Sequence, residues 1–486
     1  MNPTLSFLRW PALLAALAVV YLGASPLARA NDLDEIRQIR TEMQQLAQRL
    51  NALEQKVAQG QPGAAAAGSA AAPISASAPV EATPATASAP KITIDNTGFT
   101  FASADSANFI KLHGLVQLDS RWYTDDHGIP NNDTFVLRRA RLIFEGGFDK
   151  IYSFLIVPEF GGGGTGVSNA PVIYDASLNI AFDPAFQLKF GKFKSPIGLE
   201  MLQNDAVLLF PERSLATNLV PSRDVGVVAG GGWSKGAVTY SAGVVNGSAD
   251  AAYANNVATD NGKDFVGRIF FRPFLADADS LLKGLGFGLG GSAGDHNKSS
   301  SLTSGYKTDS QQTFFTYRST VTPYGTTWRV SPQANYYVGP LSLQTEYTAS
   351  AVTALVGTSK IDVRNSAWQV GVGYFLTGEK ASYDGIVPLS PFRPGSGGWG
   401  AWEIAARVDR LKIDSDAFPL LSDPAASASG ATAYGLGLNW YLSKTIRFDL
   451  DYVLTNFDRA SGTTSTTNTL IGADERAILT RVQVGF

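Results

Sequence analysis

The sequence predicts an all-β protein built around a transmembrane antiparallel β-barrel of about sixteen strands. The last ten residues, 477–486 (AILTRVQVGF), alternate between an apolar face that ends on Phe486 and a face that carries Arg481 and Gln483. Segments of about ten residues with the same alternation recur from residue 91 onward, separated by Gly, Asn, Asp, Ser and Pro clusters. The 49 glycines and 11% of aromatic residues suit short strands, tight turns and aromatic belts.

Five later segments show the alternation most clearly. Each has an apolar, often aromatic face that we expect to turn outward and a polar or glycine-bearing face that we expect to turn inward. A soluble β-sandwich alternates too, but Trp and Tyr at the ends of the outward faces favour a membrane interface. The segments are 341–347, 368–376, 402–410, 434–442 and 446–454.

The first thirty residues (1–30) are typical of a secretory signal peptide. Arg9 precedes an apolar run at 13–22, and Ala28-Arg29-Ala30 forms an A-x-A cleavage site. The apolar run is shorter than the ~20 residues that a membrane-spanning helix needs, which argues against a retained anchor. We therefore expect cleavage, export and a barrel in the outer membrane of a Gram-negative cell.

Residues 31–58 are predicted to form an α-helical coiled coil, since two apolar positions recur every seven residues. Isoleucine at both positions of the first heptad favours a trimer. The alternative is one amphipathic helix packed against its own domain. The apolar positions are Ile36, Met43, Leu50 and Val57, with Ile39, Leu46 and Leu53 offset from them by three.

Residues 59–90 are mostly Ala, Gly, Ser and Pro and lack the apolar surface needed to fold. They are predicted to be a disordered linker between the coiled coil and the barrel domain, 91–486. Contact of the N-terminal segment with peptidoglycan is compatible with this composition.

The composition argues against several other classes of protein. The absence of Cys excludes disulfides and thiolate metal sites, and three scattered histidines do not suggest a zinc site, so we expect no metal and no cofactor. A net charge of −3 gives no support to nucleic-acid binding. His113 is the one histidine in a clear strand, and no G-x-S-x-G motif accompanies it, so we do not expect an enzyme.

The inward faces of the predicted strands carry many arginines. On the second predicted strand Arg139 and Arg141 fall on the inward face, whereas Arg138 falls in the outward phase and is expected to reach the rim. A row of guanidinium groups facing water favours a path for anions. The alternative is that these arginines pair with carboxylates across the wall and stiffen it, as Arg407 and Arg447 could with Asp409 and Asp449. The inward candidates for the anion path are Arg121, Arg139, Arg141, Arg268, Arg272 and Arg481.

Several stretches, in one order along the barrel, resemble the phosphate-selective porins O and P. The resemblance implies a homotrimeric, sixteen-stranded outer-membrane porin for inorganic anions such as phosphate, embedded in membrane lipid. It also implies a third loop folded into the lumen and a ladder of arginines that leads phosphate to it. The stretches are VLRRARLIFEGGFDK (136–150), GKFKSPIGLE (191–200), ERS (212–214), PSRDVGVVAGG (221–231), YFLTGE (374–379) and GAWEIAARVDRL (400–411).

The region that matches the family's third loop contains as many acids as bases. Its candidate anion-path residues are Lys192, Lys194, Arg213 and Arg223, and its acids are Glu200, Asp205, Glu212 and Asp224. This balance departs from the uncompensated cluster that strict phosphate selectivity needs. We therefore expect an anion-preferring porin whose leading solute is phosphate or polyphosphate.

An alternative function is a general, weakly selective porin in which the coiled coil and linker serve mainly to tether the envelope. Deletion of residues 32–90 separates the two functions. Under the tether hypothesis, conductance and selectivity survive the deletion while envelope integrity fails.

Overall fold

The computed structural model describes residues 89–124, 132–162, 171–252, 256–258, 260–297, 305–460 and 474–486, together with Gln48 and Leu302. The predicted signal peptide, almost all of the coiled coil and most of the linker lie outside the described residues, and they stay predictions. The barrel belongs to the compact unit Ala85–Phe486. Among the described residues, no helix has both the length and the apolar character needed to cross a membrane.

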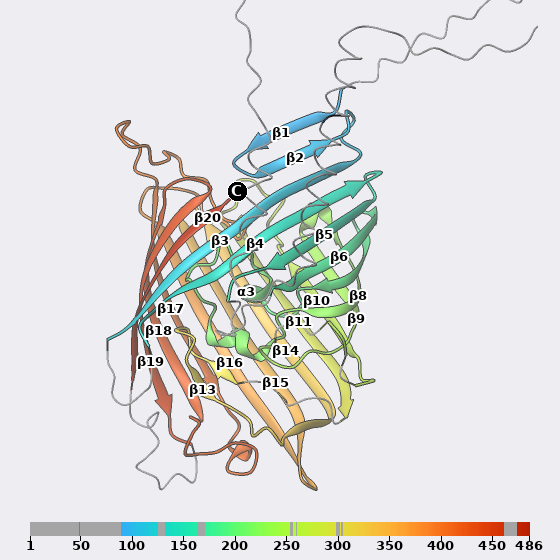
Figure 1. Cartoon of the computed structure of the whole chain (residues 1–486), viewed down its shortest axis with the longest axis vertical. Helices are drawn as coiled ribbons and strands as arrows, with labels where there is room; N and C mark the ends of the chain where they lie inside the picture. Colours follow the sequence, from blue (N-terminus) through green and yellow to red (C-terminus); the bar gives the residue numbers. More distant parts are fainter. Residues whose placement is uncertain are drawn as a thin grey trace, which may run out of the picture. The chain divides into compact units, whose positions relative to one another are not determined.

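Eighteen antiparallel strands form one sheet, and sixteen of them close into a barrel (Figure 1). The other two, β1 and β2, form a hairpin that is added to the edge of β3. The first strands are β1 (Lys91–Asp95), β2 (Gly98–Ala102), β3 (Phe109–Tyr123), β4 (Thr134–Phe148), β5 (Tyr152–Glu159), β6 (Val172–Asp183), β7 (Phe186–Phe193), β8 (Asp224–Trp233), β9 (Val238–Val245), β10 (Asp264–Phe271) and β11 (Leu285–Asn297). The later barrel strands are β14 (Thr322–Val338), β15 (Leu341–Val356), β16 (Ser359–Phe375), β17 (Ala401–Lys412), β18 (Gly430–Tyr441), β19 (Ile446–Asp458) and β20 (Glu475–Gly485).

Short helices and a small second sheet lie in the connections. They are α3 (Leu199–Leu202), the 3-10 helices η2 (Leu215–Leu219), η3 (Ser234–Gly236), η4 (Leu281–Gly284) and η5 (Ser415–Ala417), and the paired strands β12 (Tyr306–Lys307) and β13 (Thr313–Phe315). Connections such as 194–223 and 413–429 join neighbouring strands at one end of the barrel, which we call the loop end. Tight turns such as 339–340 mark the other end, which we call the turn end.

The barrel closes where β20 pairs with β3, from Ala477 opposite Tyr123 to Gly485 opposite Leu115. The pairing continues to the chain end, since the Gly114 N–H donates to the Phe486 carbonyl at 2.8 Å. Closure pairs the first and last strands of the barrel with each other, so that neither presents an open edge to lipid, where an unpaired backbone group is costly. The closing strand predicted from the last ten residues is therefore confirmed.

The outward faces of the strands are apolar, as the alternation predicts. Leu436 and Leu450 are 65% and 51% exposed, whereas Arg481, on the opposite face of its strand, is 2% exposed. Aromatic side chains gather on the outer surface at the turn end, where the Trp402 and Trp440 rings stack 5.0 Å apart. Such belts are typical of the two membrane interfaces.

One predicted orientation is wrong. In the pairing of β3 with β4, Gln117 lies opposite Arg139 but Leu118 lies opposite Leu137, so Arg138 is an extra residue in a β-bulge. The bulge turns Arg138 inward beside Arg139, and its side chain is buried with only 7% exposure. A strict period of two cannot predict this reversal, because the bulge shifts the phase by one residue.

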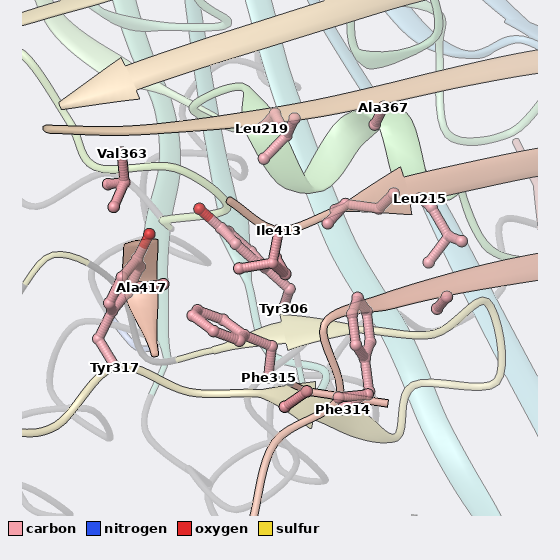
Figure 2. Close-up of a cluster of buried hydrophobic side chains, with 14 of the residues drawn as sticks. Leu215, Leu219, Tyr306, Phe314, Phe315, Tyr317, Val363, Ala367, Ile413 and Ala417 are labelled. Atoms are coloured by element: carbon pink, nitrogen blue, oxygen red, sulfur yellow. The ribbon is translucent and has the colours of Figure 1, made fainter. Parts of the chain in front are cut away.

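An apolar cluster fills part of the barrel interior toward the loop end (Figure 2). The aromatic residues Tyr306, Phe314 and Phe315 are contributed by the segment 305–321, and Leu215 by η2. They pack on small inward side chains of the wall, such as Ala367. Small wall residues leave room for the inserted segments, and the buried apolar surface stabilises their position.

Candidate functional site

The connection between β7 and β8, residues 194–223, lies inside the barrel, and we call it the inner loop. Its backbone N–H groups donate to wall carboxylates, from Leu199 to Glu346 at 2.8 Å and from Leu215 to Asp409 at 3.0 Å. Its carbonyls accept hydrogen bonds from inward side chains of six strands. These bonds satisfy backbone N–H and C=O groups that are buried and have lost their hydrogen bonds to water. The wall donors are Gln117, Gln333, Arg407, Asn439, Arg447, Arg481 and Gln483.

The start of the inner loop lies against β11 because a glycine leaves space for it. A Cβ added to Gly290 would lie 2.2 Å from the Ile197 carbonyl oxygen, so a larger residue would displace the loop. The same carbonyl accepts a hydrogen bond from the Gln333 side chain at 2.8 Å. The sequence therefore places a glycine where the start of the loop lies close to the wall.

The carboxylate of Asp205, in the inner loop, lies within ion-pair distance of three arginines. Arg141 and Arg213 bond directly to its carboxylate, and Arg139 lies 3.5 Å from it. Burial alone would raise the pKa of this carboxyl, but Arg213 and the two wall arginines outweigh burial and hold the pKa well below its usual range. Asp205 is therefore ionised and ties the loop to β4.

The carboxylate of Glu212, also in the inner loop, lies within ion-pair distance of three further arginines. Its carboxylate accepts a forked pair of bonds from Arg138, at 2.5 and 2.9 Å, and lies 3.2 Å from Arg121 and 3.8 Å from Arg481. Two wall carboxylates complete the cluster, since Asp119 pairs with Arg481 at 2.7 Å and Glu159 with Arg141 at 2.6 Å. We call these ten groups the arginine cluster. Six guanidinium groups share four carboxylates, which leaves an excess of positive charge.

A second β-bulge adds an aromatic side chain at the same level. Val157 pairs with Asp175 but Pro158 pairs with Ile173, so Tyr174 is the extra residue of β6 and is buried. The guanidinium carbons of Arg223 and Arg141 lie 3.5 and 4.1 Å from the centre of its ring. Cation–π contacts of this kind fix the planes of both guanidinium groups.

Two cavities of several hundred Å³ adjoin the inner loop in the described part of the chain, and the loop contributes to the lining of both. The outer cavity, of about 380 Å³, includes Arg138, Arg213 and residues of the segment 305–313 in its lining. The inner cavity, of about 540 Å³, is lined by the turn-end halves of β3 to β10 together with Lys194 and Leu202 of the inner loop. The described residues contain no group of three His, Cys, Asp or Glu side chains placed to hold a metal ion.

Comparison with known proteins gives the family. A model of phosphate-selective porin O and P matches residues 110–486. The chain belongs to this family. It is 26% identical over 433 residues to Porin O of Pseudomonas aeruginosa, which covers 80% of this chain and 91% of that protein. The fold is similar to that of the outer membrane channel DcaP of Acinetobacter baumannii, with a TM-score of 0.50, 13% identity and coverage of 79% of this chain and 99% of that one.

The chain is therefore an outer-membrane porin, and a non-enzymatic channel is what its family and barrel fold indicate. Of the sequence-predicted residues of this porin, Arg121, Arg139, Arg141, Arg213 and Arg481 meet in the arginine cluster, and Arg223 lies against Tyr174. The wall pairs expected under the alternative also form, between Arg407 and Asp409 and between Arg447 and Asp449.

The other four predicted residues lie outside the cluster. Lys192 bonds to the Ile173 carbonyl at 2.7 Å, and Lys194 to the Gln203 carbonyl at 2.6 Å. Arg268 donates to Gln333 at 2.9 Å, and Arg272 donates to the Gly236 carbonyl at 2.8 Å in the turn between β8 and β9. Arg272 therefore caps a turn of the barrel.

Sequence reasoning misses two residues of the site, Tyr174 and Lys189, although Lys189 lines the inner cavity. It includes Arg138 but orients the side chain outward, toward the rim, because it applies strict alternation. The cost of an arginine in lipid is a signal that could have identified Arg138. Tyr174 gave no such signal, because its inward orientation depends on the bulge.

Proposed function

We propose that this porin is a passive channel for small anions, with phosphate or polyphosphate as its leading solute. The observation that carries the proposal is the arginine cluster, in which six guanidinium groups share four carboxylates beside two cavities of the lumen. Guanidinium groups donate in a planar fork that matches phosphate and carboxylate oxygens. The family to which the chain belongs supports phosphate as the solute.

In this proposal the inner loop is the constriction of the pore. Anions pass from the outer cavity along Arg138, Arg139 and Arg213 to the inner cavity, where Lys194 and Arg268 line the wall. The partial compensation by Asp205 and Glu212 makes binding weak enough for anions to leave, which conduction requires.

The test is the reversal potential of the full-length porin in planar bilayers under a potassium chloride gradient. We expect a reversal potential whose sign indicates anion preference. We also expect added phosphate to reduce the chloride current. A cation preference would contradict the anion channel, and a chloride current insensitive to phosphate would contradict the phosphate site.

The double variant Arg139→Gln with Arg141→Gln is expected to shift selectivity toward cations. The matched control is Arg410→Gln, since Arg410 pairs with Asp458 at 2.6 Å in an exposed ion pair on the outward face of β17. The control is expected to leave the reversal potential unchanged. Equal reversal potentials for the double variant and the wild type would place both arginines off the ion path.

We also propose that the porin assembles as a homotrimer in the outer membrane. The heptads of residues 31–58 and the family membership support three subunits. Native mass spectrometry of the porin released from detergent measures the number of subunits. A monomer or dimer as the largest species would contradict the homotrimer.

A further inference from the structure

The inner cavity is lined by three cations that have no carboxylate partner in the described part of the chain. Among the described residues, no carboxylate lies within ion-pair distance of Lys189, Lys194 or Arg268, and all three line this cavity. The one acid in the lining, Glu145, is already paired with Lys111 at 3.2 Å and lies 3.6 Å from His113. The unpaired positive charge thus lies on the turn-end side of the inner loop, apart from the arginine cluster.

The same cavity has apolar walls next to these cations. Phe193 and Val228 face the lumen on β7 and β8 and pack together, and Leu155, Pro196 and Leu202 line the cavity with them. Lys189 lies directly opposite Val228 in the pairing of β7 with β8. A charged nitrogen and a hydrocarbon surface are therefore neighbours on one wall.

This combination suits a different solute from inorganic phosphate. An apolar wall cannot replace the hydration of a phosphate ion, because it offers no hydrogen bonds. It does stabilise a hydrocarbon group whose surface leaves water on contact. A volume of about 540 Å³ lies within the range typical of small-molecule sites.

We propose that the inner cavity binds small organic carboxylates that carry an apolar ring or chain. The carboxylate pairs with Lys189, Lys194 or the guanidinium fork of Arg268, and the hydrocarbon part lies on Phe193, Val228 and Leu155. This proposal rests on the anion channel proposed above and adds a second class of solute to it. The site differs from the arginine cluster in that, among the described residues, no carboxylate pairs with its cations.

The experiment compares benzoate with acetate as blockers of chloride current through the full-length porin in planar bilayers. Both carry one carboxylate, and only benzoate carries a ring. We expect half-block by benzoate at a concentration on the order of tenfold lower, the effect of burying roughly 60 Å² of ring surface. Equal half-block concentrations in an anion-selective channel would overturn this inference alone, whereas a cation-selective channel would overturn the proposed function and this inference with it.

Two variants separate the charge from the apolar wall. Lys189→Gln is expected to weaken the block by both anions, whereas Leu155→Ser is expected to weaken the block by benzoate and leave acetate unchanged. The matched control is Val227→Ser, which alters the outward neighbour of Val228. If either variant fails to fold, the comparison of benzoate with acetate on the wild-type porin still tests the proposal. A preference for benzoate that survives Leu155→Ser would contradict the apolar contact.

Discussion

Asp205 and Glu212 are the two carboxylates around which the arginine cluster is organised, and each lies within ion-pair distance of three guanidinium groups. Both come from the inner loop, whereas five of the six arginines come from the wall. Buried charges are tolerated only when they are paired and hydrogen-bonded. The pairs therefore hold the inner loop in place and also set how much positive charge remains for a passing anion.

Glu212→Gln is expected to increase the preference for anions, because it removes one of the four carboxylates that offset the arginines. It is also expected to destabilise the inner loop by about 3–5 kcal/mol, the usual cost of breaking a buried ion pair. Reversal potentials measure the first effect, and the temperature at which the folded barrel loses its compact gel migration measures the second. Asp458→Asn, in an exposed pair, is the control, and a fall in anion preference on Glu212→Gln would contradict the compensating role of Glu212.

Lys194 gives a prediction about pH. Burial lowers the pKa of its ammonium well below the usual lysine value, and Asp205 only partly offsets this while Arg213 and Arg223 add to it. Lys194 carries its charge below that pKa and loses it as the pH rises. The preference for anions is therefore expected to fall at a pH at which a solvated lysine would still be charged.

Lys194→Arg is the matched variant for this prediction, because arginine keeps its charge over the whole range. Its reversal potential is expected to stay constant where that of the wild type changes. An equal fall in both proteins would assign the titration to another group.

At the scale of elements, the sequence predicts the strands well and the bulges not at all. The outward and inward faces of β18, β19 and β20 follow from alternation because their pairings run without a register shift. Arg138 and Tyr174 escape this reasoning, since one extra residue reverses the face locally. Alternation does not predict the acidic partners of the arginines either, because the positions of Asp205 and Glu212 depend on how the inner loop folds across the lumen.

The contact between β11 and the inner loop gives a test of this folding. Gly290→Val is expected to displace the start of the loop, because its side chain would overlap the Ile197 carbonyl. The single-channel conductance is expected to rise and the anion preference to fall. Gly267→Val on the neighbouring strand is the control, since a Cβ there meets its nearest atom at 3.5 Å. Unchanged conductance in Gly290→Val would show that the loop start does not limit the current.

At the scale of the whole molecule, the barrel interior is filled unevenly. The apolar cluster of Figure 2 fills the lumen beside β15 to β20, and the two cavities lie mainly on the side of β3 to β10. Ions are therefore expected to follow a path along one side of the barrel. Alternation along the strands gives no sign of this asymmetry, because it arises from segments inserted between them.

Deletion of residues 32–90 is expected to leave conductance and selectivity unchanged, since the closed barrel and the inner loop make their contacts within residues 91–486. Planar bilayers measure both properties, and leakage of periplasmic enzymes measures envelope integrity. Loss of anion selectivity would show that the N-terminal segment contributes to the pore. Leakage with normal selectivity would favour the tether.

The seam of the barrel has one further consequence. The edge of β3 is divided between two partners, with β2 paired as far as Leu112 and β20 from Leu115 onward. The hairpin of β1 and β2 therefore occupies the length of edge along which β20 would have to slide in order to pair further toward the turn end. A slip of one residue would turn Arg481 toward lipid and Val482 toward the lumen. The hairpin thus blocks that slide, and with it one change in the stagger on which the diameter of the barrel depends.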